Sequence, residues 1–376
     1  LSVRQRATEM ALLKSVGATP AQVRRMIIVE TAVIAVAATL LAVGPAMLGG
    51  RWLLDALIST DQVASSVSYA FGSIAVSMGV GITVVAATGA AILAARRATR
   101  MGVTESLMDA AIEKPKMSKK RIVAACVAFA VAIELAVLTM VLTVDQGYES
   151  MQTAGSADIF AAIGLAIVAP ALIRMVIAVV AGPLQRLGGV AGYLTVQNMR
   201  QRAKQMASAV MPIILFTGIG IGTLYMQSIE NDAVAAEGLV KTNEQNNIET
   251  LNFIVIGMIV AFAAILLINT LIAATVYRSR EFGQQRLTGA TPGQVLATVA
   301  LEGVVLTVTG VFFGTIASLF TILPYAAART DSLIPDVGPV IYLVMVAVAA
   351  LLTLGVSLDT ARRKIRTPAV EAVAVP

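Results

Sequence analysis

The chain has 376 residues, of which 57% are hydrophobic and 13% are charged, and its mean hydropathy is +0.84. Charged residues make up about a quarter of an ordinary water-soluble domain, so this composition excludes one and predicts a protein that is solvated by lipid. Because there is no His and only one Cys, the sequence also excludes intrachain disulfides, Cys/His zinc sites and Ser-His or Cys-His catalysis.

Eight apolar stretches follow one another along the chain, each more than 20 residues long and nearly free of charge. Such a stretch can cross a hydrocarbon core of about 30 Å as a helix, and the alternation typical of barrel strands is missing. The sequence therefore predicts an all-α polytopic membrane protein. Its expected spans are 26–48, 71–95, 122–144, 157–181, 207–228, 251–277, 298–324 and 339–360.

The basic residues predict the orientation of these spans. Of the 28 Lys and Arg residues, 24 lie in alternate connecting segments, which assigns those segments to the cytoplasm. The net charge of +6 is thus explained without nucleic acid. We expect a multi-pass protein of the bacterial cell membrane, whose basic tails at 96–121 and 361–366 bind anionic lipids.

A segment near the beginning recurs 272 positions later. Residues 6–30, RATEMALLKSVGATPAQVRRMIIVE, match residues 278–302, RSREFGQQRLTGATPGQVLATVALE. The pattern RR-x-x-R-x4-E, which begins at Arg96, also recurs at Arg362. Two motifs repeated in the same order predict a duplicated unit, and the six spans between the copies make the repeat parallel.

The repeat divides the chain into three predicted domains. Residues 1–110 form the first unit, and residues 111–206 form a transmembrane hairpin with an interfacial linker. Residues 207–376 form the second unit, with a short outer loop at 229–250. Because a helix precedes the motif only in the later copy, we expect the natural protein to have at least one further helix upstream of residue 1.

Each copy of the motif predicts a short helix, a tight turn and the start of the next helix. We call these segments the first elbow (6–22) and the second elbow (278–294). Thr-Pro-x-Gln is a capping box with proline at the first helical position, and the preceding glycine favours the left-handed end of a helix. The residues that build the two turns are Gly17, Thr19 and Pro20, and Gly289, Thr291 and Pro292.

An elbow at the cytoplasmic face is suited to be displaced by a soluble motor protein that binds to it. On this hypothesis Glu9, Lys14, Glu281 and Arg286 are the exposed charges that meet the partner. Any interfacial elbow would use the same caps, but two copies at equivalent places favour a docking element.

The pattern R-x-x-E-x7-GATP-x-Q-V, followed by a glutamate in the next helix and by the RR-x-x-R-x4-E tail, resembles the FtsX-like permeases. These are the membrane subunits of MacB-type ABC transporters. The segments around Pro170 and Gln197 are similar to the middle section of the family's long members. The resemblance implies that the elbows act on a cytoplasmic, homodimeric ABC ATPase, and that an extracytoplasmic accessory protein is a possible further partner.

No phosphate-binding Gly-x4-Gly-Lys-Ser/Thr loop occurs, so ATP and Mg²⁺ are expected on the partner ATPase. This chain is expected to be non-catalytic, without cofactor or metal. Two alternatives stay open: an ion-coupled secondary carrier, and a membrane scaffold that regulates a cell-wall enzyme or a sensor. Charged residues within spans are costly and are therefore candidate functional residues; these are Glu30, Glu134, Arg174 and Glu302.

Overall fold

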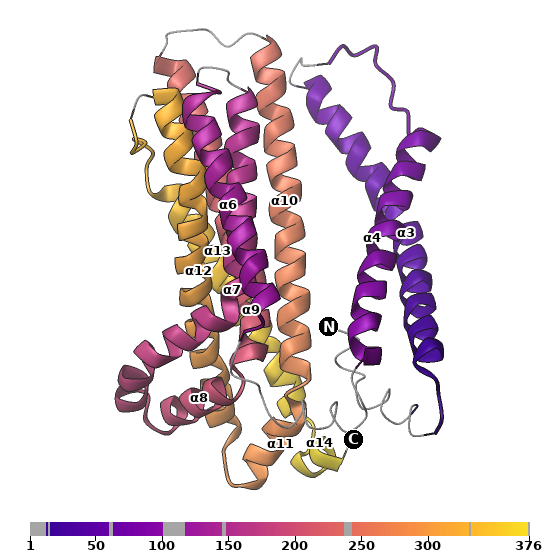
Figure 1. Cartoon of the computed structure of the whole chain (residues 1–376), viewed down its shortest axis with the longest axis vertical. Coiled ribbons are helices and arrows are strands. Elements are labelled where there is room, and N and C mark those ends of the chain that lie inside the picture. Colours follow the sequence, from indigo (N-terminus) through magenta and orange to yellow (C-terminus); the bar gives the residue numbers. More distant parts are fainter. Residues whose placement is uncertain are drawn as a thin grey trace. The chain divides into compact units, whose positions relative to one another are not determined.

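The computed structural model describes residues 13, 16–59, 63–100, 117–144, 148–236, 243–330 and 332–374. These residues form helices and no strands (Figure 1), which confirms the all-α fold class. The helices are α3 (Pro20–Ser59), α4 (Ser73–Arg100), α6 (Lys119–Val141), α7 (Tyr148–Leu187), α8 (Gly189–Gln201), α9 (Ala203–Ala236), α10 (Asn243–Val276), α11 (Ser279–Leu287), α12 (Pro292–Thr330), α13 (Val340–Ile365) and α14 (Ala369–Ala374).

Eight of the described helices, α3, α4, α6, α7, α9, α10, α12 and α13, are long and apolar enough to cross a membrane. This number confirms the prediction from hydropathy, but several helices extend beyond the apolar runs. The expected outer loop at 229–250 is one example, because α9 continues to Ala236 and α10 begins at Asn243. An apolar run marks the thickness of the hydrocarbon, whereas backbone hydrogen bonds can continue a helix into water.

The chain forms two compact units, Leu1–Pro115 and Lys116–Pro376. In the first unit, α3 packs along α4, with Val23, Ile27 and Ala95 buried between them. The second unit contains the predicted hairpin (α6 and α7), the linker helix α8 and the whole second repeat. Residues 111–206 and 207–376 therefore pack into one body over most of their length.

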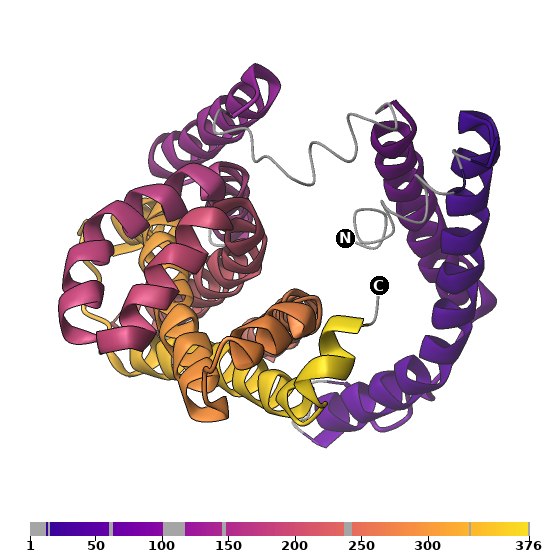
Figure 2. The ribbon, with the colours of Figure 1, turned by 90° about the horizontal axis from the view of Figure 1, so that it is seen from below.

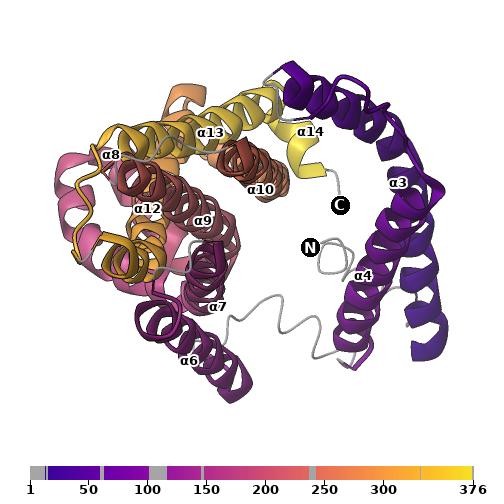
Figure 3. The same ribbon diagram turned by 90° about the horizontal axis from the view of Figure 1, so that it is seen from above.

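The core of the second unit lies around α9, which packs against α7, α10, α12 and α13 (Figure 3). Small residues let α9 and α12 approach closely. A Cβ atom at Gly314 would lie 2.8 Å from the Thr217 Cβ and 3.0 Å from the Gly218 nitrogen. The Thr217 hydroxyl also donates to the Gly310 carbonyl at 3.2 Å. Close approach of small residues is the usual way in which helices associate within lipid.

Three short helices, α8, α11 and α14, gather at one end of the second unit (Figures 1 and 2). We call this the basic end, because the sequence assigns its connecting segments to the cytoplasm. α8 packs on α7 and α12, while α11 packs on α12, α13 and α14. The linker predicted to be interfacial is thus helical, and it returns against α7 after a tight turn at Gly188 and Gly189.

Candidate functional site: the elbows and the basic end

The second elbow is built as its sequence predicts. α11 ends at Leu287, Gly289 has a left-handed φ of 101°, and the Ala290 N–H donates to the Gln285 carbonyl at 2.9 Å. These are the features of a Schellman cap. The Thr291 N–H then donates to the Gln294 Oε1 at 2.9 Å, and the Gln294 N–H donates back to the Thr291 Oγ1 at 3.3 Å. This reciprocal capping box begins α12 at Pro292.

The first elbow repeats this turn. Gly17 has a φ of 103°, and the Ala18 N–H donates to the Leu13 carbonyl at 2.9 Å. Thr19 and Gln22 exchange hydrogen bonds at 2.8 and 3.3 Å, just where Pro20 begins α3. The predicted caps are thus confirmed in both copies. Glu9 and Lys14 lie outside the described residues, so their role stays a prediction.

The back of the second elbow is fixed to two neighbouring helices. Arg286 donates from Nη1 to the carbonyls of Ile365 and Thr367, both at 2.8 Å, where α13 ends. α14 packs against Gly283, at which a Cβ would lie 3.1 Å from the Ala372 Cβ. This close approach explains why the second copy has glycine where the first has Ala11.

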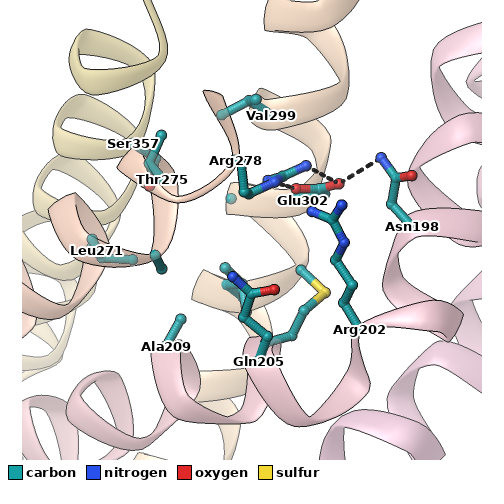
Figure 4. Close-up of a pocket in the computed structure, with 14 residues that line it drawn as sticks. Asn198, Arg202, Gln205, Ala209, Leu271, Thr275, Arg278, Val299, Glu302 and Ser357 are labelled. Carbon is teal, nitrogen blue, oxygen red and sulfur yellow. Dashed lines mark hydrogen bonds and ion pairs between the residues drawn. The ribbon is translucent and has the colours of Figure 1, made fainter. Parts of the chain in front are cut away.

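Ion pairs that are largely shielded from solvent connect the same elbow to α12 and to Arg202, the residue between α8 and α9. Glu302, 3% exposed, accepts hydrogen bonds from Arg278, one of them at 3.0 Å, and from the Asn198 amide at 3.3 Å (Figure 4). Arg278 also donates from Nε to Glu281 at 3.1 Å, and Arg202 donates to the same Glu281 oxygen. We call these five residues the charge network. Its members come from α8, from the residue between α8 and α9, from the residue preceding α11, and from α11 and α12.

Comparison with protein families agrees with this architecture. The family model described as FtsX-like permease C-terminal matches residues 1–103 and 253–369, which is more than half of the chain. The chain belongs to the FtsX-like permease family. The two matched segments each contain one copy of the repeat. No match was found among curated proteins or among solved structures.

The family match and the eight apolar helices identify this permease as a multi-pass protein of the bacterial cell membrane. Members of this family are of the type that serves as the membrane subunit of ABC transporters. Such permeases in general associate with an ABC ATPase and are typically non-catalytic. The family assignment does not depend on the charge network, which lies partly in residues 198–202, between the matched segments.

One expectation about the second elbow of the permease is wrong. Glu281 is not an exposed charge, because its side chain is 13% exposed and is held by Arg202, Arg278 and Gln285. Arg286 is likewise engaged, with the end of α13. The elbow instead exposes its turn, where Leu287 is 55% exposed. The sequence placed these charges at the elbow, but which way they face depends on packing against α9 and α13.

The charged residues predicted inside spans have different surroundings. Glu302 is buried in the charge network, whereas Glu134 is exposed on α6. Arg174 is half-buried and donates from Nε to the Pro170 carbonyl at 2.8 Å, and Glu30 is half-buried on α3. Within the second unit, neither Glu134 nor Arg174 is among the hydrogen-bond partners of Glu302. Their functional roles stay predictions.

Sequence reasoning missed Asp158, Asn198 and Arg202. Asp158 on α7 is fully buried, and within the described parts of the chain neither of its carboxylate oxygens has a hydrogen-bond partner. It lies in a notch at Gly222, where a Cβ would be 3.1 Å from the Asp158 Cγ. The acid stands at the edge of the apolar run 157–181, and a charge inside such a run was a usable signal.

Proposed function

We propose that this permease couples ATP hydrolysis by a separate, homodimeric ATPase to a conformational change outside the membrane or to export of a substrate. The observation that carries the proposal is the construction of the second elbow. Its turn is exposed, while its back is fixed by the charge network, by Arg286 and by α14. An element that is free on one side and rigidly held on the other can transmit a force.

Specific contacts of α11 would transmit this force to the neighbouring helices. Displacement of α11 would act on α9 through Glu281 and Arg202, and on α12 through Arg278 and Glu302. It would act on α13 through Arg286. Buried ion pairs favour one geometry over alternatives, so the basic end would move as a body instead of deforming.

The first elbow has the same turn and also presents an apolar side chain, Val16, which is 88% exposed. Two elbows with the same turn are suited to the two subunits of a homodimeric ATPase. On this proposal, ATP and Mg²⁺ bind to the partner. An extracytoplasmic accessory protein and anionic lipids complete the proposed set of partners.

The test uses the whole protein, purified in nanodiscs with its candidate P-loop ATPase. Leu287→Asp places a charge on the exposed turn without touching the charge network. We expect at least about 10-fold weaker association, since a charge buried in an interface costs more than about 1.4 kcal/mol, and we expect loss of ATPase stimulation. Ile334→Asp is the matched control, because Ile334 is 79% exposed and follows the end of α12 that is opposite to the second elbow.

The proposal is wrong if no ATPase co-purifies with the wild-type protein, or if Leu287→Asp behaves like Ile334→Asp. One observation favours the ion-coupled carrier as a second candidate, namely the buried and unpartnered Asp158. A carrier would transport without ATP in response to an ion gradient, and Asp158→Asn would abolish that transport.

A further inference from the structure

A pocket that is partly open to solvent lies at the basic end between α9, α10, α12 and α13. One part of its wall is apolar and includes Met206, Ala209, Leu271 and Leu306. The other part is polar and includes Asn198, Arg202, Gln205, Arg278 and Glu302 (Figure 4). The pocket is therefore amphipathic.

The polar wall has hydrogen-bond donors that the carboxylates of the pocket do not use. The carboxylate of Glu302 is occupied by Arg278 and Asn198, and that of Glu281 by Arg202, Arg278 and Gln285. In the described parts of the chain, the side chain of Arg202 makes one hydrogen bond, from Nη1 to Glu281. Its remaining N–H groups and the Gln205 amide face a pocket whose acids are already paired, and they suit an anionic oxygen ligand.

The two parts of the wall lie at different depths. Arg202 precedes the apolar run 207–228, and Arg278 follows the run 251–277, so both belong at the headgroup level. Ala209 and Leu271 are each seven residues further into their helices, or about 10 Å deeper at 1.5 Å per residue. The anion-binding part is thus at the membrane surface, and the apolar part extends toward the membrane centre.

We propose that this pocket binds an anionic phospholipid of the cytoplasmic leaflet, with the phosphate on Arg202 and Gln205 and an acyl chain along Met206, Ala209, Leu271 and Leu306. A soluble phosphate would use the polar wall but would leave the apolar wall empty. Basic pockets between helices on the cytoplasmic side are general sites for lipid headgroups. Because Arg202 also holds Glu281, a bound lipid would stabilise the attachment of the second elbow to α9.

The test measures binding of phosphatidylglycerol to the whole, delipidated protein by native mass spectrometry. We expect Arg202→Gln to weaken binding by at least about 10-fold, as expected for loss of a charge-assisted hydrogen bond worth about 1.5–3 kcal/mol. Arg200→Gln is the matched control, since Arg200 is exposed, lies two residues away and carries the same charge. We expect it to bind like the wild type.

A second variant tests the apolar wall without changing any charge. Ala274 lines the pocket and is half-buried, so Ala274→Trp should fill the acyl-chain space and also lower binding by at least about 10-fold. Glycerol phosphate, which has no acyl chain, should bind far more weakly than the lipid. The proposal is overturned if Arg202→Gln and Arg200→Gln bind alike, if Ala274→Trp binds like the wild type, or if glycerol phosphate matches the lipid.

Discussion

Glu302 is the most deeply buried member of the charge network, and its carboxylate depends on Arg278 and Asn198 for hydrogen bonds. We predict that Glu302→Gln lowers the free energy of unfolding by about 3 kcal/mol, because Arg278 then loses one of its two carboxylate partners inside the protein. Thermal unfolding of the purified permease in detergent measures this loss.

The control for Glu302 is an acid at the same end that makes an exposed ion pair. Asp359 pairs with Arg363 at 2.9 Å, and their side chains are 60% and 76% exposed. An exposed pair contributes about 0–1 kcal/mol, so Asp359→Asn should leave the unfolding temperature nearly unchanged. Equal losses in the two variants would contradict the structural importance of the network.

Replacing Asp158 should have the opposite effect on stability from replacing Glu302. Burial of a carboxylate whose oxygens have no hydrogen-bond partner among the described residues lowers the stability of the fold through the cost of desolvation, and no hydrogen bond offsets that cost. Asp158→Asn keeps its shape and removes the ionisable group, so we predict unchanged or higher thermal stability. A fall of several degrees in the unfolding temperature would instead indicate that the carboxylate has a stabilising ligand.

Among the elements of the second unit, α9 and α12 pack against each other most extensively. We predict that Gly314→Ala lowers stability by about 1–3 kcal/mol, since the new methyl would overlap Thr217 and approach the backbone nitrogen of Gly218. The matched control is Gly355→Ala on α13, where a Cβ would meet nothing within 4 Å. There we expect a slight gain from helix propensity. Denaturation in detergent compares the two, and similar behaviour would rule out tight packing at Gly314.

The elements also show what could be predicted from the sequence. The eight spans follow from hydropathy, and the two elbow turns follow from Gly and Thr-Pro-x-Gln, because those signals act within a few residues. The network could not be predicted in the same way. Glu302 meets Asn198, 104 positions away, and Glu281 meets Arg202, 79 positions away. Such pairs depend on how α8 and α9 pack on α12, which no local pattern specifies.

At the scale of the whole molecule, the two units differ in how much they bury. In the most apolar 18-residue windows of α9 and α12, 72% and 61% of residues are buried, compared with 11% in α3 and 6% in α4. The charge network, the second elbow and the proposed lipid pocket all belong to the second unit. The stability of that unit should therefore come mainly from its own helix–helix contacts.

We accordingly predict that residues 116–376, expressed alone, unfold cooperatively in detergent near the temperature of the whole chain, and that Glu302→Gln and Gly314→Ala lower this temperature by the same amounts in both. Residues 1–115 alone should show no cooperative transition, because the buried cluster among the residues described there, Val23, Ile27 and Ala95, is small. Circular dichroism during heating measures both fragments. If 116–376 unfolded without cooperativity, the stability of the network would depend on the first unit, and the two copies of the repeat would have to be treated as one folding unit.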